Sequence, residues 1–301
     1  MKSDVTFRSG GMAIAGHLYL PEDLQPGERR PAIVTVTPWS GLKEQTAGLY
    51  ARRMAEQGFV ALAFDHRNYG DSEGLPRFDE DPFAKSEDIK NAVTFLAGHD
   101  AVDADRIGAI GICAGGGYVP YTAATDRRIK AVATVSGVHS LRGFLAEDAR
   151  MDRETLIASL DACGKAREAY EHGEEPAYMP VFPEDAPAGS APLLLEAPDY
   201  YLNPARGGHP NWANKTVLWS LEKVASFSAL EMISLIAPHP VLFIAGTHAD
   251  TAHHSQAAYA AAGEPKELYW IEGASHIDLY DRDQYVTPAV AKMTDFFRSA
   301  L

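Results

Sequence analysis

The sequence predicts an α/β fold with a mainly parallel sheet and a helical insertion. Short apolar runs rich in β-branched residues alternate with segments of helical periodicity, as expected for strands that are buried on both faces between helices. This alternation stops between residues 139 and 235 and then resumes. We therefore expect a core made of residues 1–138 and 236–301, and an inserted helical cap over residues 139–235.

The core elements follow from period-2 and period-3.6 patterns of apolar residues. An N-terminal hairpin is expected first, because alternate residues of its second strand are apolar. In chain order, the expected strands cover 5–8, 12–20, 32–37, 59–64, 106–112, 130–135, 240–246 and 267–271, and the expected helices cover 45–56, 82–96, 118–125, 255–262 and 288–297.

The inserted segment combines a helical pattern over 153–170 with loops rich in Pro, Gly and Asn over 174–192 and 203–214. Aromatic residues recur in it: Tyr170, Tyr178, Phe182, Tyr200, Tyr201, Trp212 and Trp219. Because α/β sheets bind ligands at the carboxyl ends of their strands, we favour a cap over that edge. The alternative is a helical subdomain that serves only packing.

Composition excludes several classes of function. A chain of 301 residues with 46% hydrophobic and 23% charged residues is typical of a soluble globular protein. A net charge of −14 argues against nucleic acid as a partner. We expect no membrane span, no signal peptide and no disulfide framework, because long apolar runs are absent and only Cys113 and Cys163 are present. The expected location is therefore the cytoplasm.

The stretch from Gly108 to Gly117 predicts a nucleophile elbow. Gly111 and Gly115 flank Cys113 at two residues on each side, which is the G-x-S-x-G pattern with Cys in the place of Ser. That pattern predicts a sharp, strained turn from a strand into a helix, with the nucleophile at the turn. The helix N-terminus is expected to favour the thiolate. The alternative is a buried Cys in a glycine-rich turn that binds a phosphate.

Two later loops supply partners for the thiol. Asp250 follows the strand that ends at Gly246, and His276 follows the strand that ends at Ile271. We expect His276 to accept the Cys113 proton and Asp250 to fix the His276 tautomer. Asp278 is the rival carboxylate, but it is only two residues from His276 and poorly placed to reach that ring.

An oxyanion hole needs two N–H donors. Ala114 follows the nucleophile and supplies one, and the loop after the first buried core strand supplies the other. Pro38 has no N–H group, so Trp39 is our choice and Ser40 is the alternative. The residues expected to contact substrate are Trp39, Ser40, Tyr118, His139, Tyr200 and Trp212.

Histidines also gather near Asp250, namely His248, His253 and His254. Their spacing matches no recognised metal site, and pairs of histidines near a carboxylate arise often by chance. We therefore expect no metal and no cofactor.

With these residues, the chain resembles the α/β-hydrolase superfamily over nearly its whole length. The closer resemblance is to dienelactone-hydrolase-like members and to YcjY-like and polyketide-transferase-like hydrolases. The matching stretches are 41–48, 65–74, 111–118 and 273–280. The resemblance implies an eight-stranded, mostly parallel sheet and a catalytic triad of Cys113, Asp250 and His276.

Two departures from dienelactone hydrolases bear on the substrate. Those enzymes lack a large insertion, and they keep a glutamate beside the thiol in the loop after the first central strand. Here that loop has Trp39 and Ser40, and Glu44 lies further on. A dienelactone substrate is therefore not expected.

The sequence predicts an enzyme that hydrolyses an ester, lactone or thioester of a small-molecule acyl substrate through a covalent acyl-enzyme. An acyltransferase or cyclase acting on a polyketide-like thioester is the alternative reaction. A non-catalytic binding protein on the same fold is the alternative of a different class. The specific substrate is left open, and so is a homodimer formed through the N-terminal hairpin.

Overall fold

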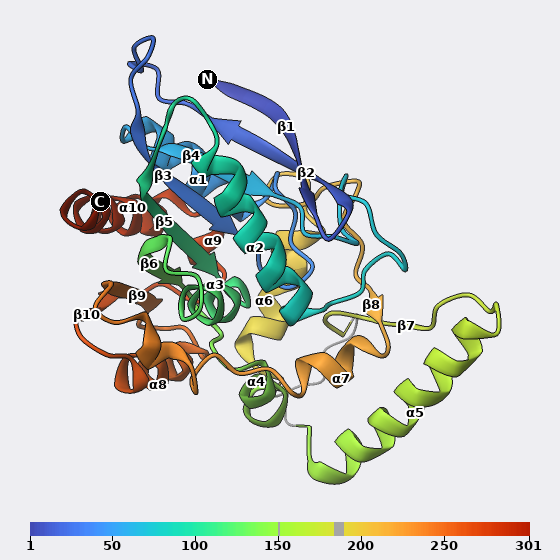
Figure 1. Cartoon of the computed structure of the whole chain (residues 1–301). Coiled ribbons are helices and arrows are strands. Elements are labelled where there is room, and N and C mark those ends of the chain that lie inside the picture. The colour runs from blue at the N-terminus through green and yellow to red at the C-terminus, as the bar shows by residue number, and fades with distance from the viewer. Residues whose placement is uncertain (150, 184–189) are drawn as a thin grey trace.

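The structure is a computed structural model that describes residues 1–149, 151–183 and 190–301. Its centre is an eight-stranded sheet with the order β1-β2-β4-β3-β5-β6-β9-β10 (Figure 1). β1 and β2 form an antiparallel hairpin, β2 pairs antiparallel with β4, and all pairs from β4 to β10 are parallel. The predicted sheet, with its hairpin at one edge, is confirmed.

The strands lie within a few residues of their expected bounds. They are β1 (Lys2–Ser9), β2 (Met12–Tyr19), β3 (Arg30–Val36), β4 (Val60–Phe64), β5 (Val102–Ile112), β6 (Ile129–Val135), β9 (Val241–Gly246) and β10 (Lys266–Ile271). β4 and β9 are buried along their whole length. Helices cover both faces of the sheet, which explains why these runs show no alternation of polar residues.

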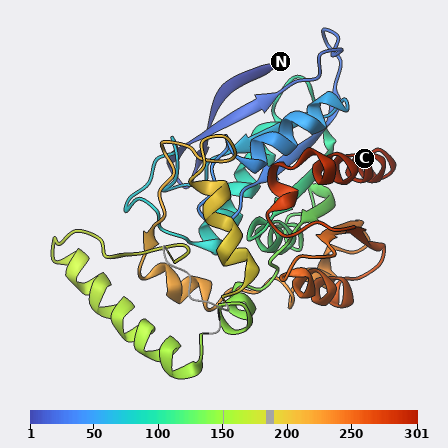
Figure 2. The ribbon, with the colours of Figure 1, turned by 180° about the vertical axis from the view of Figure 1, so that it is seen from behind.

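Two helical layers enclose the sheet, as the opposite views in Figures 1 and 2 show. α1 (Thr46–Glu56) and α10 (Asp283–Ala300) share one apolar core with the sheet, and α2 (Pro82–Ala97), α3 (Gly115–Ala123) and α8 (Ala252–Ala261) share the other. The expected start of the last helix at Pro288 is wrong. Val286 is buried and extends the apolar stripe of Val290, Met293 and Phe297, so α10 starts five residues earlier.

Residues between β6 and β9 add no strand to the large sheet in the described part of the chain. They form α4 (Leu141–Glu147), α5 (Arg153–Glu171), β7 (Tyr178–Met179), α6 (Pro192–Tyr201), β8 (Thr216–Val217), α7 (Ser220–Val224) and a 3₁₀ turn (Ile233–Ile236). α5 stands away from the body in Figures 1 and 2, and Cys163 is its one buried residue. Part of the loop expected over 174–192, residues 184–189, lies outside the described residues.

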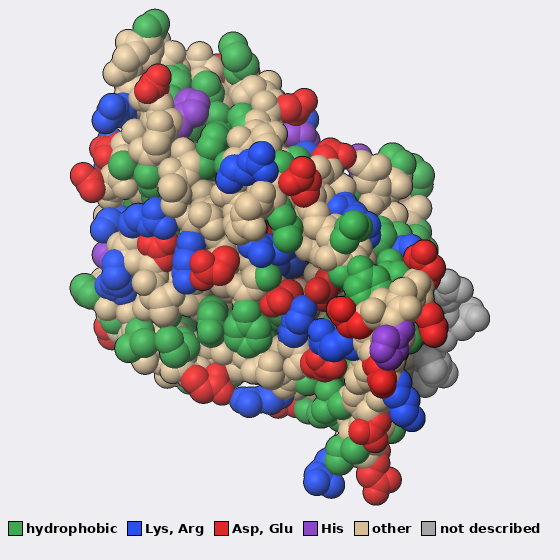
Figure 3. Space-filling model, turned by 45° about the vertical axis from the view of Figure 1, so that its right-hand side comes forward, with side chains coloured by type: hydrophobic (Ala, Val, Ile, Leu, Met, Phe, Trp, Pro, Cys, Tyr) green, Lys and Arg blue, Asp and Glu red, His purple; other side chains and the backbone are tan. Residues whose placement is uncertain are grey.

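The surface carries charges of both signs. On the face shown in Figure 3, acidic and basic side chains are interspersed, and neither sign forms a continuous field. Among the described helices, none combines the length and the apolar character that crossing a bilayer requires.

Candidate functional site

The elbow around Cys113 has the geometry that the glycine pattern predicts. β5 ends at Ile112, α3 begins at Gly115, and Cys113 takes a φ of 53°, in the left-handed region that costs energy for a residue with a Cβ. A Cβ added to Gly111 would lie 2.2 Å from the Gly115 carbonyl oxygen, and one added to Gly115 would lie 2.7 Å from that of Val36. Strand, helix and β3 therefore approach too closely for side chains at these positions.

Three polar groups converge on the Cys113 sulfur. Burial raises the pKa of Cys113 to about 11, while the Tyr280 hydroxyl and the backbone N–H groups of Ala114 and Trp39 act in the opposite direction by hydrogen bonding. Loss of water thus outweighs these hydrogen bonds, and the resting group is a thiol. The Ala114 N–H group at the helix N-terminus acts in the direction that the sequence predicted, but burial has the larger effect on the pKa of Cys113. The two N–H groups are those that the sequence predicted for an oxyanion hole.

The Tyr280 hydroxyl group links the His276 ring to the Cys113 thiol. Its Nε2 is 3.3 Å from the Tyr280 hydroxyl oxygen, and its Nδ1 is 2.5 Å from Thr251 Oγ1. Burial is the main cause that lowers the pKa of His276 to about 3, and the charge of His254 acts in the same direction. The imidazole is therefore neutral at neutral pH and can accept a proton.

Asp250 lies beside this group but has a different partner in the structure. Its Oδ2 accepts a hydrogen bond of 3.0 Å from the backbone N–H of Leu193, in the first turn of α6. Thr251 lies at the His276 Nδ1 atom, where the sequence placed Asp250. Asp278 accepts from the Ser275 N–H instead. β9 and β10 are neighbours as expected, but β6 separates them from β5.

A cavity of about 530 Å³, including its mouth, opens above the thiol. Cys113, Ala114, Pro38 and Trp39 belong to its wall on the core side, and α4 and α6 contribute apolar side chains. The complete described lining is Pro38, Trp39, Cys113, Ala114, Val138, Leu141, Phe144, Val181, Phe182, Leu193, Leu194, Ala197, Tyr201, Ile277 and Tyr280. No charged residue occurs in it, so it suits an apolar ligand.

Of the residues expected to contact substrate, Trp39 lines this cavity. The other five, Ser40, Tyr118, His139, Tyr200 and Trp212, are buried and are not among the described lining residues. The Trp212 ring stacks on Phe182 and Tyr201, with ring centroids 5.6 and 4.9 Å away, and its Nε1–H donates to Ser40 Oγ. These two residues thus support the aromatic side chains that face the cavity.

Tyr118 belongs to a buried polar cluster that the sequence did not predict. Its hydroxyl donates to Glu80 Oε1 at 2.5 Å, and Tyr69 donates to Glu80 Oε2 at 2.7 Å. Lys85 Nζ lies 2.7 and 2.8 Å from the two Glu80 oxygens. The Glu80 charge also acts to raise the pKa of Cys113. A carboxylate is therefore present near the thiol, but it comes from the residues before α2.

Sequence reasoning also missed Tyr280 and Thr251. Tyr280 ends the last matching stretch, four residues after His276, and its hydroxyl turns back toward that ring. Thr251 directly follows Asp250, so only the backbone path decides which of the two side chains meets His276. A search for hydroxyl groups next to the predicted triad residues would have found both.

Comparison with known proteins assigns the chain to a family. The family described as X-Pro dipeptidyl-peptidase (S15 family) matches residues 10–174, more than half of the 301-residue chain. The matched range includes both the Trp39 loop and the Cys113 elbow.

Two bacterial relatives match nearly the whole chain. Uncharacterized protein PA2218 of Pseudomonas aeruginosa is 40% identical over 92% of this chain and 76% of its own length. Its crystal structure superposes with a TM-score of 0.92 and 37% identity, over 100% of this chain and 94% of that chain. Uncharacterized protein YcjY of Escherichia coli (strain K12) is 34% identical over 100% of both chains.

Fungal relatives have names that describe acyl chemistry. A thiohydrolase of Eupenicillium brefeldianum is 28% identical over 98% of this chain and 93% of its own, and other fungal relatives are named as an acyltransferase and a polyketide transferase. The α/β-hydrolase fold and the resemblance to YcjY-like and polyketide-transferase-like proteins are confirmed. By its family match and these relatives, the chain belongs to the S15 peptidase family of α/β-hydrolases.

Proposed function

We propose that the protein is a hydrolase of carboxylic esters or thioesters, with Cys113 as its nucleophile. One observation carries the proposal: Cys113, Trp39, Ala114 and Tyr280 line the same cavity, where the Tyr280 hydroxyl and the two N–H groups favour negative charge on the Cys113 sulfur. Such preorganised donors stabilise the oxyanion that forms when a nucleophile attacks an acyl carbonyl.

The neutral thiol and neutral imidazole define the proton path. As the Cys113 sulfur bonds to the acyl carbon, its proton passes to the Tyr280 oxygen, and the Tyr280 proton passes to His276 Nε2. The carbonyl oxygen becomes an oxyanion and accepts from the Trp39 and Ala114 N–H groups. The proton on His276 then leaves with the alcohol or thiol, and an acyl-Cys113 thioester remains. In the second half of the reaction, a water oxygen bonds to the acyl carbon while His276 takes a proton from that water. The C–S bond then breaks, the proton returns from His276 through Tyr280 to the Cys113 sulfur, and the acid leaves.

His276 needs a fixed orientation to act as this base. In the structure Thr251 Oγ1 is 2.5 Å from Nδ1 and can accept the Nδ1–H, which leaves Nε2 free to receive a proton. We propose this role for Thr251 in the state described, in place of the Asp250 contact that the sequence predicted.

The lining supports an apolar acyl group in preference to a peptide. A dipeptidyl-peptidase substrate presents a charged N-terminal ammonium group, and the described lining residues include no Asp or Glu to pair with it. The name of the fungal thiohydrolase supports a thioester. We propose that residues 139–235 act as the cap, because α4 and α6 supply Leu141, Phe144, Leu193 and Tyr201 to the cavity.

The test compares nitrophenyl esters, acyl thioesters and an X-Pro nitroanilide as substrates. We expect turnover of the esters and thioesters, and an acyl adduct on Cys113 detected by mass spectrometry. Cys113→Ala should abolish both. Cys163→Ala is the matched control, because Cys163 is the other cysteine of the chain and lies on α5, whose residues are absent from the described cavity lining.

Full turnover by Cys113→Ala would show that Cys113 is not the nucleophile. Turnover of the X-Pro nitroanilide alone would replace the ester proposal with a peptidase. Acyl transfer is the second candidate, favoured by a lining with few groups to hold water. Added alcohol or amine acceptors would divert the acyl group from acid to a new ester or amide, and the product ratio measures this.

A further inference from the structure

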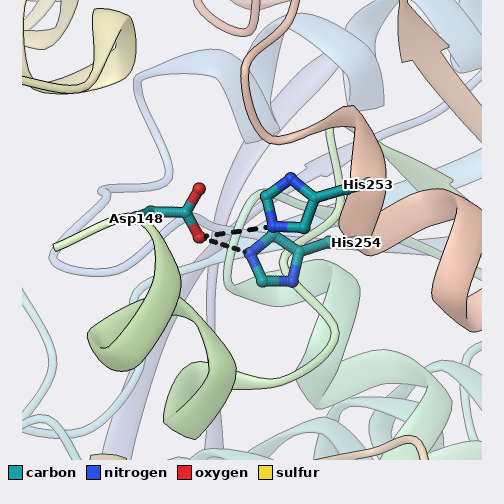
Figure 4. A group of neighbouring side chains, drawn as sticks. All are labelled: Asp148, His253 and His254. Carbon is teal, nitrogen blue, oxygen red and sulfur yellow. Dashed lines mark hydrogen bonds and ion pairs between the residues drawn. The ribbon is translucent and has the colours of Figure 1, made fainter. Parts of the chain in front are cut away.

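A second cluster of chemically active side chains lies beside the candidate active site, where α4 meets α8. Glu147 is the last residue of α4 and Asp148 is its C-cap, and His253 and His254 lie in the first turn of α8. Figure 4 shows the rings of His253 and His254 beside the Asp148 carboxylate. His254 Nε2 is 2.7 Å from Asp148 Oδ2, and His253 Nε2 is 3.6 Å from the same oxygen. His253 Nε2 is also 3.3 Å from Glu147 Oε2. Two imidazoles therefore point at one carboxylate oxygen from one side.

The hydrogen bonding of His253 determines which of its nitrogens is free. Its Nδ1 lies 3.0 Å from the Asp250 carbonyl oxygen, which can only accept, so Nδ1 carries the proton. Nε2 is shielded from water and has no hydrogen-bond partner in the described structure. In the neutral ring, this nitrogen presents a lone pair toward two carboxylates. A lone pair facing negative oxygens is unfavourable unless a proton or a metal cation lies between them.

We propose that Asp148, His253 and His254 bind a divalent transition metal ion such as Zn²⁺, with Glu147 or water as the fourth ligand. Two imidazole nitrogens and a carboxylate form a donor set typical of zinc. The ligand atoms of the three residues all lie within 4.8 Å of one another. Tetrahedral zinc with ligand distances of about 2.0–2.2 Å separates its ligands by about 3.4 Å.

The observed separations are close to that arrangement. The 3.3 and 3.6 Å distances from His253 Nε2 match it, and the 2.7 Å contact between His254 and Asp148 must lengthen by about 0.7 Å. The Nδ1–H of His253 donates to a backbone carbonyl, as metal-binding histidines commonly do with their second nitrogen. This proposal departs from the sequence expectation of no metal.

A metal ion at this position would join the insertion to the catalytic loop. Glu147 and Asp148 end α4, which lines the cavity, and the carbonyl that orients His253 belongs to Asp250. The ion would act as a structural clamp, and no step of the proposed hydrolysis passes through it. The inference therefore stands apart from the proposed function.

The test titrates chelator-treated full-length protein with Zn²⁺ in a calorimeter and records its melting temperature. We expect one ion per chain with micromolar or tighter affinity, a rise in melting temperature of several degrees, and visible absorption of bound Co²⁺ that reports nitrogen and oxygen ligands. His253→Gln should weaken binding by about tenfold or more. His248→Gln is the matched control, because His248 is exposed, lies in the preceding loop and is outside the cluster.

Asp148→Asn should also lose the ion. Should that variant fail to fold by circular dichroism, His253→Gln decides, because its side chain is 39% exposed. Absence of binding to the wild-type protein would overturn the proposal, and so would equal binding by His253→Gln and His248→Gln. Ester hydrolysis by the metal-free protein is measured separately, so failure of either proposal leaves the other distinguishable.

Discussion

Cys113 combines a strained backbone with a thiol that burial keeps protonated. Its φ is 53°, and burial raises its pKa to about 11. The group thus resembles the serine of the G-x-S-x-G pattern more than the preformed thiolate of an ion pair. Reactivity must come from proton removal during attack.

The first prediction concerns alkylation of Cys113. Because the thiolate fraction rises tenfold with each pH unit below the pKa, labelling by iodoacetamide should be slow near neutral pH and rise by about tenfold per pH unit up to about pH 10. Mass spectrometry of the Cys113 peptide gives the rate. A rate that levels off near neutral pH would show a thiolate at rest and would contradict the proposed proton path.

The second prediction separates Thr251 from Asp250. Thr251→Val removes the group at His276 Nδ1 and should lower kcat by roughly tenfold, the value of one buried hydrogen bond. Asp250→Asn keeps an oxygen that can accept from Leu193, so its loss of kcat should be smaller. Steady-state kinetics on a nitrophenyl ester measures both. A larger loss of kcat in Asp250→Asn than in Thr251→Val would show that Asp250 orients His276, as the sequence predicted.

At the scale of elements, local patterns predicted the elbow because its geometry depends on the backbone. The spacing of Gly111 and Gly115 already requires strand and helix to meet without side chains. Likewise, the loops with Asp250 and His276 follow two strands whose apolar and β-branched residues are visible in the sequence, although only β9 is buried throughout and the edge strand β10 is buried only at Ile271.

The cavity wall could not be predicted in the same way. Phe182 faces the cavity while Trp212 stacks behind it. Both are aromatic residues in irregular segments, and only packing between distant parts of the chain decides which is exposed. Thr251 was missed for a related reason, since the backbone turn after β9 selects it over its neighbour.

The third prediction tests the elbow with a pair of glycine substitutions. Gly115→Ala would place a Cβ 2.7 Å from the Val36 carbonyl oxygen and should destabilise the protein by several kcal/mol, in the manner of an overpacked core. Gly164→Ala, in α5, meets nothing within 4 Å and should stabilise the protein by about 0.5–1 kcal/mol. Denaturant unfolding measures both, and equal effects would contradict the close approach of β3 and α3.

For the whole molecule, buried histidines link folding to pH. Burial lowers the pKa of both His139 and His276 to about 3. Below about pH 6.5 the unfolded chain binds protons at these residues that the folded chain does not bind. The stability that these neutral side chains contribute is therefore complete above that pH and is lost as the pH falls toward 3.

The fourth prediction follows from this linkage. Within that window, each of the two histidines should lower the free energy of unfolding by roughly 1.4 kcal/mol for every pH unit by which the pH falls. His139→Gln should therefore reduce the difference in stability between about pH 7 and about pH 4.5, measured by denaturant titration at each pH. His172→Gln is the control, because His172 is exposed on the surface after α5. If the His139→Gln variant and the wild-type protein showed the same difference in stability between the two pH values, the claim that His139 is buried in its neutral form would be contradicted.

The hydrogen bond between the Leu193 N–H and Asp250 joins the first turn of α6 to the loop that carries Thr251. If the cavity holds an acyl chain as proposed, a shift of α6 that admits a longer chain would also displace the loop beside His276. The proposed function then couples substrate binding to the chemical step. Chain length should then alter kcat as well as KM, so that the enzyme senses the size of its substrate through its rate.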